Sequence, residues 1–316
     1  MSCPELEAGA ANTGAEHYTA LPAALLPPIP ESMGSTASYT VSVIIPAYDR
    51  LERLPTAIDS VQSQSYAAHE LIVVDDGSTD GTADWLAEHH PEITLIRQNN
   101  HGVSHARNRA IEHASGNWIA LLDSDDRWYE NKLAEQVNAL QQAPQMRLCH
   151  CDEHWLRNGK RVNPRHKHRK YGGDIFTHCL PLCCISPSAV LIHRTLLDEV
   201  GLFDESLPAC EDYDLWLRIC SREEVLYLDQ ALLEKTGGHE DQLSQRYPAM
   251  DQFRLQALAK LLRSHTLTVS QTQQASELFI EKLVIFCNGA RKRHRHDAVD
   301  TLQSEYRDLI DPTLIL

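Results

Sequence analysis

The sequence predicts an α/β fold with a mostly parallel central sheet flanked by helices, and a C-terminal α-helical appendage. Short, continuous apolar runs of strand length alternate with segments whose apolar residues recur at helical spacing. Continuous apolar runs are typical of parallel strands covered on both faces. Most runs end in polar or acidic residues, which places these residues at the sheet edge where open α/β sheets bind ligands.

Strands and helices are expected to alternate between residues 41 and 122. The first strand is expected to break at Pro46, because proline has no N–H to donate within a central strand. The helix that follows carries Leu54, Ile58 and Val61 on one face. The expected strands are Val41–Ile45, Leu71–Val74, Ile93–Ile96 and Trp118–Leu122, and the later helices begin near Thr82 and Ser104.

The charge balance and the cysteine pattern exclude several classes of protein. The 316 residues carry 29 Lys and Arg against 44 Asp and Glu, a net charge of −15, which argues against nucleic-acid binding. The acidic start MSCPELEAG is unlike a signal peptide and no apolar run reaches membrane-spanning length, so we expect a cytoplasmic protein without a transmembrane segment. The nine cysteines lack the paired C-x₂-C spacing of zinc sites and are expected as reduced, often buried thiols.

A cluster of three carboxylates follows the last of these strands, in the segment Asp123-Ser124-Asp125-Asp126. Carboxylates this close repel one another unless a cation lies among them, and Mg²⁺ or Mn²⁺ prefers one or two carboxylates plus phosphate oxygens. The alternative is a solvated acidic turn. No Gly-rich phosphate loop is present, so phosphates would be held chiefly by metal.

Polar residues at the other strand ends fit a nucleotide. An aromatic ring such as that of Tyr48 can stack on a base, and carboxylates such as Asp76 can accept from a base N–H or from ribose hydroxyls. Arg107 is a candidate cation for phosphate. The alternative for Tyr48 and Arg107 is packing and a surface ion pair.

Four segments together carry a family resemblance: VSVIIPAYDR, LIVVDDGSTDGT, GVSHARNRAI and LLDSDDRWYENKL. In this order and spacing, over residues Tyr39–Leu133, they resemble the nucleotide-sugar half of a family 2 glycosyltransferase of the GT-A fold. The resemblance implies Mn²⁺ or Mg²⁺ as cofactor, with Asp125 as its main ligand and Asp123 near both metal and ribose. It implies a donor site, for which we expect a UDP-sugar, made of Pro46, Tyr48, Asp76, Arg107, Asp123 and Ser124.

The second half is expected to bind the acceptor. A strand over Arg147–Asp152 leads to a hairpin that turns at Asn158-Gly159, and another buried strand is expected over Ala189–Ile192. Between them, the run Arg165–Lys170 is basic in an otherwise acidic chain. It either recognises an anionic acceptor or is a solvated loop.

The segment EDYDLW places two acids at the start of a helix, where acids complement the helix dipole. Inverting glycosyl transfer needs a carboxylate that removes the proton of the attacking hydroxyl. The segment resembles the Glu-Asp motif of the same family, which implies Asp212 as catalytic base and Glu211 as the residue that orients the acceptor. The alternative is a capping carboxylate.

A loop with two glycines, around Gly237-Gly238-His239, follows the second half. Some family relatives complete the metal sphere with a histidine after the catalytic helix, which implies His239 as a third ligand. Simple hydrogen bonding within the loop is the alternative. Beyond residue 246, apolar stripes predict helices that pack on the catalytic domain, support a homodimer or, through the basic run Arg291–Arg295, contact an acidic membrane surface at its inner face.

We therefore expect a loosely docked tail (residues 1–39), a GT-A domain (40–245, divided into 40–133 for the nucleotide-sugar and 134–245 for the acceptor) and a helical region (246–316). The expected activity is metal-dependent, inverting transfer of a sugar to a hydroxyl of a glycan, as in cell-surface polysaccharide synthesis. One rival is a sugar-phosphate nucleotidyltransferase, which would need a Gly-rich basic loop after the first strand. The other is a non-catalytic nucleotide-sugar binding module, which would need no base.

Overall fold

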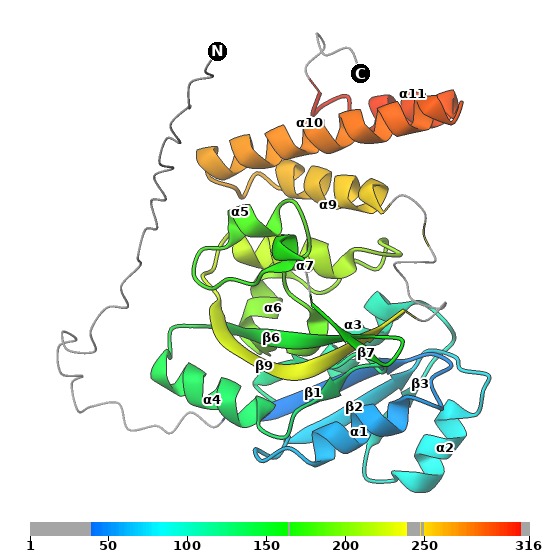
Figure 1. Cartoon of the computed structure of the whole chain (residues 1–316), viewed down its shortest axis with the longest axis vertical. Helices are drawn as coiled ribbons and strands as arrows, with labels where there is room; N and C mark the ends of the chain where they lie inside the picture. Colours follow the sequence, from blue (N-terminus) through cyan, green and yellow to red (C-terminus); the bar gives the residue numbers. More distant parts are fainter. Residues whose placement is uncertain (1–38, 164, 239–246, 248–249, 311–316) are drawn as a thin grey trace, which may run out of the picture. The chain divides into compact units, whose positions relative to one another are not determined.

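The computed structural model describes residues 39–163, 165–238, 247 and 250–310. These residues form one sheet with helices on both faces, in the strand order β3-β2-β1-β4-β8-β6-β9-β5, with β7 paired to the outer side of β6 (Figure 1). Of the expected tail (residues 1–39), only Tyr39 is described, and its ring stacks on Trp118; the rest of the tail and His239 lie outside the described residues. No helix within the described ranges is both long and apolar enough to cross a membrane.

Four neighbouring strands are parallel, as the apolar runs predicted. They are β3 (Thr94–Arg97), β2 (Glu70–Asp75), β1 (Val41–Ala47) and β4 (Trp118–Leu121). β1 and β4 are buried along their whole length, which explains their continuous apolar sequence. The connecting helices are α1 (Leu54–Gln62), α2 (Thr82–His89) and α3 (Val103–His113).

The other half of the sheet is mixed, which the expectation of a mostly parallel sheet did not include. β8 (Leu191–His193) is antiparallel to β4 and to β6 (Leu148–Arg157), while β6 runs parallel to the long β9 (Leu226–Gly237). The short strands β5 (Arg127–Trp128) and β7 (Lys160–Val162) add antiparallel edges. β9 was not predicted: Lys235–Gly237, expected at the start of a loop, belong to this strand.

Two apolar cores lie on opposite faces of the sheet. One contains α1 and α4 (Lys132–Gln142). The other contains α3, α5 (Phe176–Cys179), α6 (Arg194–Val200), α7 (Glu211–Cys220) and the C-terminal helices. The remaining elements are the short 3₁₀ turns η1 (His166–His168) and η2 (Pro187–Ala189).

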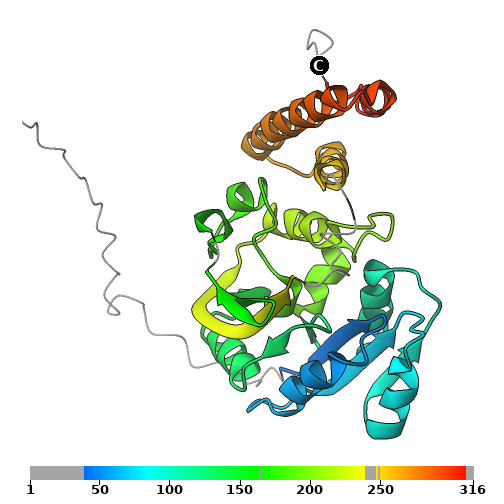
Figure 2. The same cartoon turned by 45° about the vertical axis from the view of Figure 1, so that its right-hand side comes forward.

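The C-terminal region is helical, as expected: α9 (Asp251–Arg263), α10 (Val269–Lys292) and α11 (His296–Glu305). α9 packs against α7 and α10, and α10 against α11 (Figure 2). The predicted stripe on α9 is buried at Phe253, Leu255, Leu258 and Leu261. On α10 the expected stripe was Leu278, Ile280, Leu283 and Ile285. Leu283 is buried, and Leu278 and Ile280 are partly buried against the core, but Ile285 is 55% exposed. The buried face is Ala275, Phe279, Leu283, Cys287 and Ala290.

Candidate active site

A pocket of about 380 Å³ lies at the carboxyl edge of the parallel strands. The strand ends supply one wall, the start of α7 a second and the end of β9 a third. Every described residue of the predicted site lines it: Pro46, Tyr48, Asp76, Arg107, Asp123, Ser124, Asp125, Glu211 and Asp212. The structure therefore brings together residues that the sequence predicts from two separate halves of the chain.

The loop after β1 presents an aromatic ring to this pocket. The Tyr48 side chain is 42% exposed. This exposure is unusual for a large side chain with an apolar ring, so packing within the protein does not explain the position of this tyrosine. The next residue, Asp49, has a positive φ of 49° and accepts a hydrogen bond from the Thr79 amide (2.7 Å), while its own amide donates to Ser78 Oγ (2.9 Å). These bonds fix the loop that carries Tyr48 against the loop after β2.

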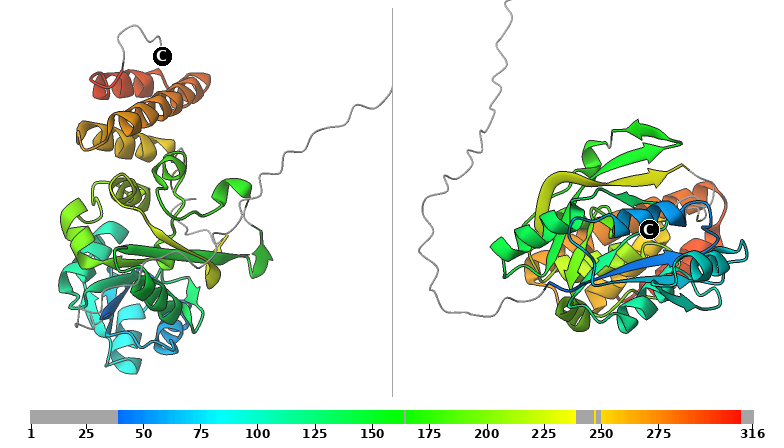
Figure 3. Two further views of the ribbon diagram at one scale, coloured as in Figure 1. Left: turned by 90° about the vertical axis from the view of Figure 1, so that its left-hand side faces the viewer. Right: turned by 90° about the horizontal axis from the view of Figure 1, so that it is seen from below.

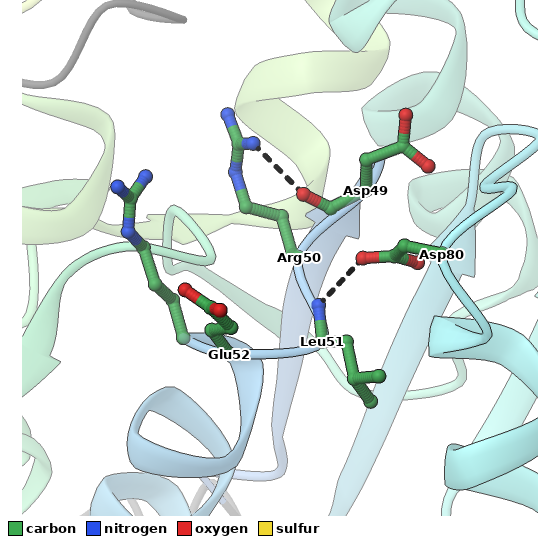
Figure 4. A pocket seen from close by; sticks show the side chains of 6 residues that line it. Asp49, Arg50, Leu51, Glu52 and Asp80 are labelled. Carbon is green, nitrogen blue, oxygen red and sulfur yellow. Dashed lines mark hydrogen bonds between the residues drawn. The ribbon is translucent and has the colours of Figure 1, made fainter.

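A second hollow, of about 470 Å³, opens beside this loop (Figure 4). It is lined by Asp49–Arg53 and Asp80 and lies over the start of α1. Asp80 accepts a hydrogen bond from the Leu51 amide (3.0 Å), and Arg50 donates to the Asp49 carbonyl (3.1 Å). The polar groups of this hollow therefore bond to one another and hold the loop. The residues of the predicted site line the first pocket.

Asp76 is buried and forms part of the pocket wall. Its Oδ1 accepts from Gln98 Nε2 (2.7 Å) and the His101 amide (2.8 Å), and its Oδ2 accepts from the Gly102 amide (2.8 Å). The carboxylate thus holds the loop before α3 in place. Its predicted contact with base and ribose stays a prediction, and these three bonds are an additional structural role.

The acidic turn after β4 contains one carboxylate with a distinct role. Asp126 is buried, accepts from Ser188 Oγ (2.6 Å) and from the Thr236 amide (2.8 Å), and so fastens the turn to η2 and β9. Burial, together with the negative charges of Asp125 and Asp123, raises the pKa of Asp126 well above its usual value. This concentration of negative charge at the pocket favours a bound cation.

The Arg107 guanidinium is bonded to two carboxylates of the protein, unlike that of an arginine whose N–H donors are all free to bind phosphate. Its side chain is 3% exposed, its Nη2 contacts Asp123 Oδ1 (2.7 Å) and its Nη1 contacts Glu211 Oε1 (2.8 Å). Burial would lower its pKa, but the two carboxylates raise it above its usual value. Arg107 therefore joins the acidic turn to α7, and the predicted contact with donor phosphate stays untested.

The start of α7 carries the two predicted catalytic acids. Cys210 precedes them with a φ of 62°, a left-handed conformation that is uncommon for a residue with a side chain and typical of functional sites. Asp212 Oδ1 accepts from the Tyr213 amide (2.7 Å), and its Oδ2 lies 3.3 Å from Cys183 Sγ. Burial and the Asp212 charge raise the pKa of Cys183, so the thiol is the donor in this pair.

Glu211, beside it, is buried against Arg107. Burial and the charge of Asp212 raise its pKa, and the Arg107 guanidinium opposes this rise. Asp212 is the less buried of the two acids and the one without an ion pair among the described contacts. The roles of Asp212 as base and of Glu211 as the residue that orients the acceptor stay predictions.

Lys235, which sequence reasoning missed, is the cation of this pocket on the β9 side. Burial would lower its pKa, but the charges of Glu153, Asp126, Asp123 and Asp212 raise it above its usual value. Its Nζ lies 3.2 Å from Ser186 Oγ. The apolar residues within Leu226–Leu233 could have indicated the strand β9. Asp229-Gln230 interrupt this apolar run, at the point where the register of the pairing with β6 shifts.

The cysteines form no zinc-like centre among the residues that the structure covers, where no group of three or more Cys, His, Asp or Glu side chains is arranged to hold a metal ion. Six of the eight described cysteines are buried free thiols, in agreement with the expectation. Cys179 Sγ lies 3.0 Å from Cys184 Sγ and 3.6 Å from Cys220 Sγ, behind α7. A metal at the acidic turn would therefore take one or two carboxylates and complete its sphere with ligand oxygens.

The mixed sheet with helices on both faces is a GT-A-type fold. Two solved structures share the fold at about 20% sequence identity. One is Staphylococcus aureus TarS in complex with UDP-GlcNAc (TM-score 0.62, covering 77% of this chain and 71% of that one). The other is a Pyrobaculum calidifontis mannosyltransferase in complex with GDP-Man and Mn²⁺ (TM-score 0.56, covering 85% and 82%).

The chain belongs to glycosyl transferase family 2, whose model matches residues 42–201, and is a glycosyltransferase. An uncharacterized glycosyltransferase of Rickettsia typhi is 32% identical over 66% of this chain and 67% of its own length. A UDP-Glc:α-D-GlcNAc-diphosphoundecaprenol β-1,3-glucosyltransferase of Escherichia coli is 34% identical over 57% of this chain and 70% of its own length. Other rickettsial relatives are longer, and the chain spans about a third of their length.

Proposed function

We propose that the protein transfers a sugar from a UDP-sugar to a hydroxyl of a growing glycan, with inversion at the anomeric carbon and with Mn²⁺ or Mg²⁺ as cofactor. The observation that carries this proposal is the single pocket that holds both Asp125, at the end of β4, and Asp212, at the start of α7. A binding module needs the first carboxylate and not the second. An inverting transferase needs both.

The donor is proposed to lie along the carboxyl ends of β1, β2 and β4. Tyr48 stacks on the base, Pro46 packs beside it, and Asp76 and Asp123 accept from base and ribose. The exposure of Tyr48 and the shared pocket support this placement. The E. coli relative is named for UDP-Glc and the TarS structure is a complex with UDP-GlcNAc, which supports the choice of UDP.

Asp125 and Asp123 would hold the divalent cation, because both carboxylates line the pocket at the end of β4. When bound, the cation neutralises charge on the departing diphosphate. Carboxylate and phosphate oxygens suit both Mn²⁺ and Mg²⁺. Ser124, between the two aspartates, is proposed to contact the donor through its backbone or hydroxyl.

Asp212 is proposed to take the proton of the acceptor hydroxyl as that oxygen attacks the anomeric carbon. Two contacts hold its carboxylate, one from the Tyr213 amide and one from the Cys183 thiol, so the base is oriented before the acceptor arrives. Glu211 stays in its ion pair with Arg107 and orients α7. Lys235 supplies a cation at the β9 wall, where it can contact a donor or acceptor oxygen.

Location and assembly belong to the same proposal. We propose action on the cytoplasmic side of a membrane with peripheral contact through the basic run Arg291–Arg295, and assembly as a homodimer. Pelleting with anionic liposomes and light scattering test the two parts separately. A protein that stays in the supernatant lacks the proposed membrane contact, and one with monomer mass lacks the proposed dimer.

A thermal-shift panel of UDP- and GDP-sugars, each with Mn²⁺, Mg²⁺ or EDTA, tests the central proposal. A ligand that binds the native state stabilises it by about 2.7 kcal/mol at a ligand concentration 100 times Kd, so one UDP-sugar should raise Tm. Because the proposed donor site includes the cation, this rise should occur only with metal. Asp125→Ala should abolish this rise. Asp198→Ala, a change of an exposed aspartate on α6, should keep it.

Asp212→Asn separates binding from catalysis in the same panel. The variant should keep the metal-dependent rise in Tm and lose slow hydrolysis of the donor by at least about a hundredfold, because general-base catalysis contributes that much. If no nucleotide sugar shifts the wild-type Tm with any metal, the proposal is wrong. If Asp212→Asn hydrolyses the donor as fast as wild type, Asp212 is not the base.

A further inference from the structure

The most basic segment of the chain lies beside the proposed acceptor side of the pocket. Residues 157–170, called the basic segment here, contain seven Arg and Lys and two His, and residues 154–173 contain no Asp or Glu, in a chain of net charge −15. Within the described part of the chain, six of these side chains are exposed and none of the six forms an ion pair: Arg157, Lys160, Arg161, Arg165, Lys167 and Arg169.

The strand register fixes the start of the basic segment next to the pocket. Trp155 of β6 is paired with Lys235 of β9 and Leu156 with Thr236, and both β9 residues line the pocket. Arg157 is paired with Gly237, and β6 and β9 run side by side to this point before the chain turns into β7 (Figure 3). The hairpin tip is therefore one strand away from the pocket wall.

A buried ion pair fixes the other end of the basic segment. Lys170 Nζ lies 2.7 Å from Glu153 Oε2, with side chains only 5% and 2% exposed. Glu153 Oε1 also accepts from Ser186 Oγ (2.9 Å) and Trp155 Nε1 (2.7 Å), and Ser186 Oγ is the group that Lys235 contacts. Burial would raise the pKa of Glu153, but Lys170 and Lys235 lower it to about 2, so this carboxylate stays charged.

These contacts show that the basic segment is held in position relative to the pocket. His168, in η1, also packs its ring against that of Trp155, with 5.1 Å between ring centroids. A solvated loop would need none of these anchors. Lys170 is buried and anchors the basic segment, whereas its other six Arg and Lys side chains are exposed.

We propose that the basic segment binds an acidic acceptor, a hydroxyl-rich chain that carries repeated phosphate or carboxylate groups. The anionic groups would bind the exposed arginines and lysines, and the terminal hydroxyl would reach Asp212 in the pocket. Arg and Lys pair well with phosphate and carboxylate, and a cluster of like charges attracts a polyanion more strongly than a single charge. This inference rests on the proposed transferase function, of which it specifies the acceptor class.

The composition of the basic segment favours a soluble polyanion over a membrane surface. Surfaces that bind membranes combine basic residues with apolar side chains that enter the interface. Within the described residues, the large exposed side chains of apolar character are Tyr48, Val269 and Ile285, and none of them belongs to the segment.

Fluorescence anisotropy with labelled oligomers tests the proposal directly. The probes are oligogalacturonate, which carries carboxylates, oligo(glycerol phosphate), which carries phosphates, and neutral dextran of similar length. Wild type should bind one of the two anionic oligomers and not dextran, with a Kd that rises with NaCl because charge pairs are screened. The oligomer that binds identifies the anionic group.

The test variant is Lys160→Gln/Arg165→Gln/Lys167→Gln. The matched control is Lys292→Gln/Arg293→Gln/Arg295→Gln, in the second basic run, at the C-terminal end of α10. Each removes three exposed positive charges. The test variant should weaken oligomer binding at least tenfold, and the control should stay within twofold of wild type. Equal weakening by both variants would mean that net charge alone attracts the oligomer, and would overturn the proposal.

Two further measurements keep the outcomes separate. Vesicles of phosphatidylglycerol that bind wild type but not the test variant, without any oligomer binding, would identify a membrane surface and overturn the proposal. The rise in Tm with UDP and Mn²⁺ is measured on every variant. If it is present while no anionic oligomer binds, only the acceptor proposal fails, whereas its absence in wild type would overturn the transferase proposal itself.

Discussion

At the scale of single residues, Arg107 connects the two halves of the site. A guanidinium offers donors in a fixed planar arrangement, so one side chain can bond two carboxylates that come from different elements. Here those carboxylates are Asp123 after β4 and Glu211 at the start of α7. The stacked Phe203 ring, 5.1 Å from the guanidinium carbon, closes the remaining side. The placement of the acidic turn relative to the start of α7 therefore depends on this one cation.

Arg107→Met should destabilise the protein by about 3–5 kcal/mol, because it leaves buried carboxylates without their counter-charge. Urea unfolding measures this, with Arg109→Met as control: Arg109 is on the same helix, but its side chain is exposed. Arg107→Lys should recover part of the stability, because it restores the charge and not the two-sided geometry. An Arg107→Met protein as stable as the Arg109→Met protein would refute the bridging role.

The sequence identified most charged residues of the pocket, but it missed Lys235 and could not show how the charges are paired. Tyr48, Asp125 and Asp212 were placed in one pocket by motif spacing, and the structure brings them there. Arg107 and Asp76 were expected to face the donor, and each also bonds to other parts of the protein. Pairing depends on contacts between residues that are far apart in the chain, and no local pattern records these contacts.

At the scale of elements, the loop after β2 depends on a close approach at Gly77. Its φ is +83°, and a Cβ there would lie 2.8 Å from the Asn100 backbone nitrogen, in the loop that Asp76 holds. Gly81, at the start of α2, has a similar φ of +93° but would meet only Leu51 Cδ2 at 3.9 Å. The two glycines therefore share the backbone requirement and differ in the space around them.

Gly81→Ala should cost about 1–2 kcal/mol, the cost of a left-handed conformation for a residue with a side chain. Gly77→Ala should cost more and should also weaken UDP binding severalfold, because the clash shifts the loop that forms the pocket floor. Urea unfolding and UDP titration measure the two effects. Equal losses of stability with unchanged UDP affinity in both variants would show that the close approach has no role in the site.

The elements that the sequence missed are those without a continuous pattern. The four parallel strands were predicted because two buried faces require uninterrupted apolar residues. β9 was missed because Asp229 and Gln230 interrupt it where its pairing with β6 slips. The face of α10 was misjudged because Leu278, Ile280 and Ile285 are apolar but lie outside the spacing of the buried face. Apolar composition alone did not distinguish the buried face from the others.

At the scale of the whole molecule, two buried groups link stability to acidity. Burial, with the charge of Lys170, lowers the pKa of His150 to about 3, and its Nε2 donates to the Tyr171 carbonyl, so the ring is neutral in the folded protein. The unfolded chain binds a proton at this histidine below pH about 6.5. Glu153, with its pKa lowered to about 2, behaves in the same direction at lower pH.

The contribution of His150 to stability should therefore fall as pH decreases from about 6.5 towards 3, by up to roughly 1.4 kcal/mol per pH unit, because the unfolded state binds more protons at this residue in this range. Below about pH 4.5, Glu153 adds to the loss. The raised pKa values of Asp126 and Glu211 act in the opposite direction, so the test is a difference between proteins. Urea unfolding between pH 4 and 7.5 should show that the stability of wild type relative to His150→Gln decreases as pH falls. For His166→Gln, a change at an exposed histidine, the difference from wild type should stay constant, and a constant difference for His150→Gln as well would contradict the prediction.

The apolar core around α7 includes side chains of α9, α10 and α11, among them Leu255, Phe279 and Tyr306. The segment recognised as family 2 ends at residue 201, before α7 and β9. A fragment cut at that boundary would leave β6 without its longest partner and Arg107 without Glu211. The match to the family model is therefore shorter than the portion of the chain that packs into one core, and that core joins the C-terminal helices to α7, the helix that carries Asp212.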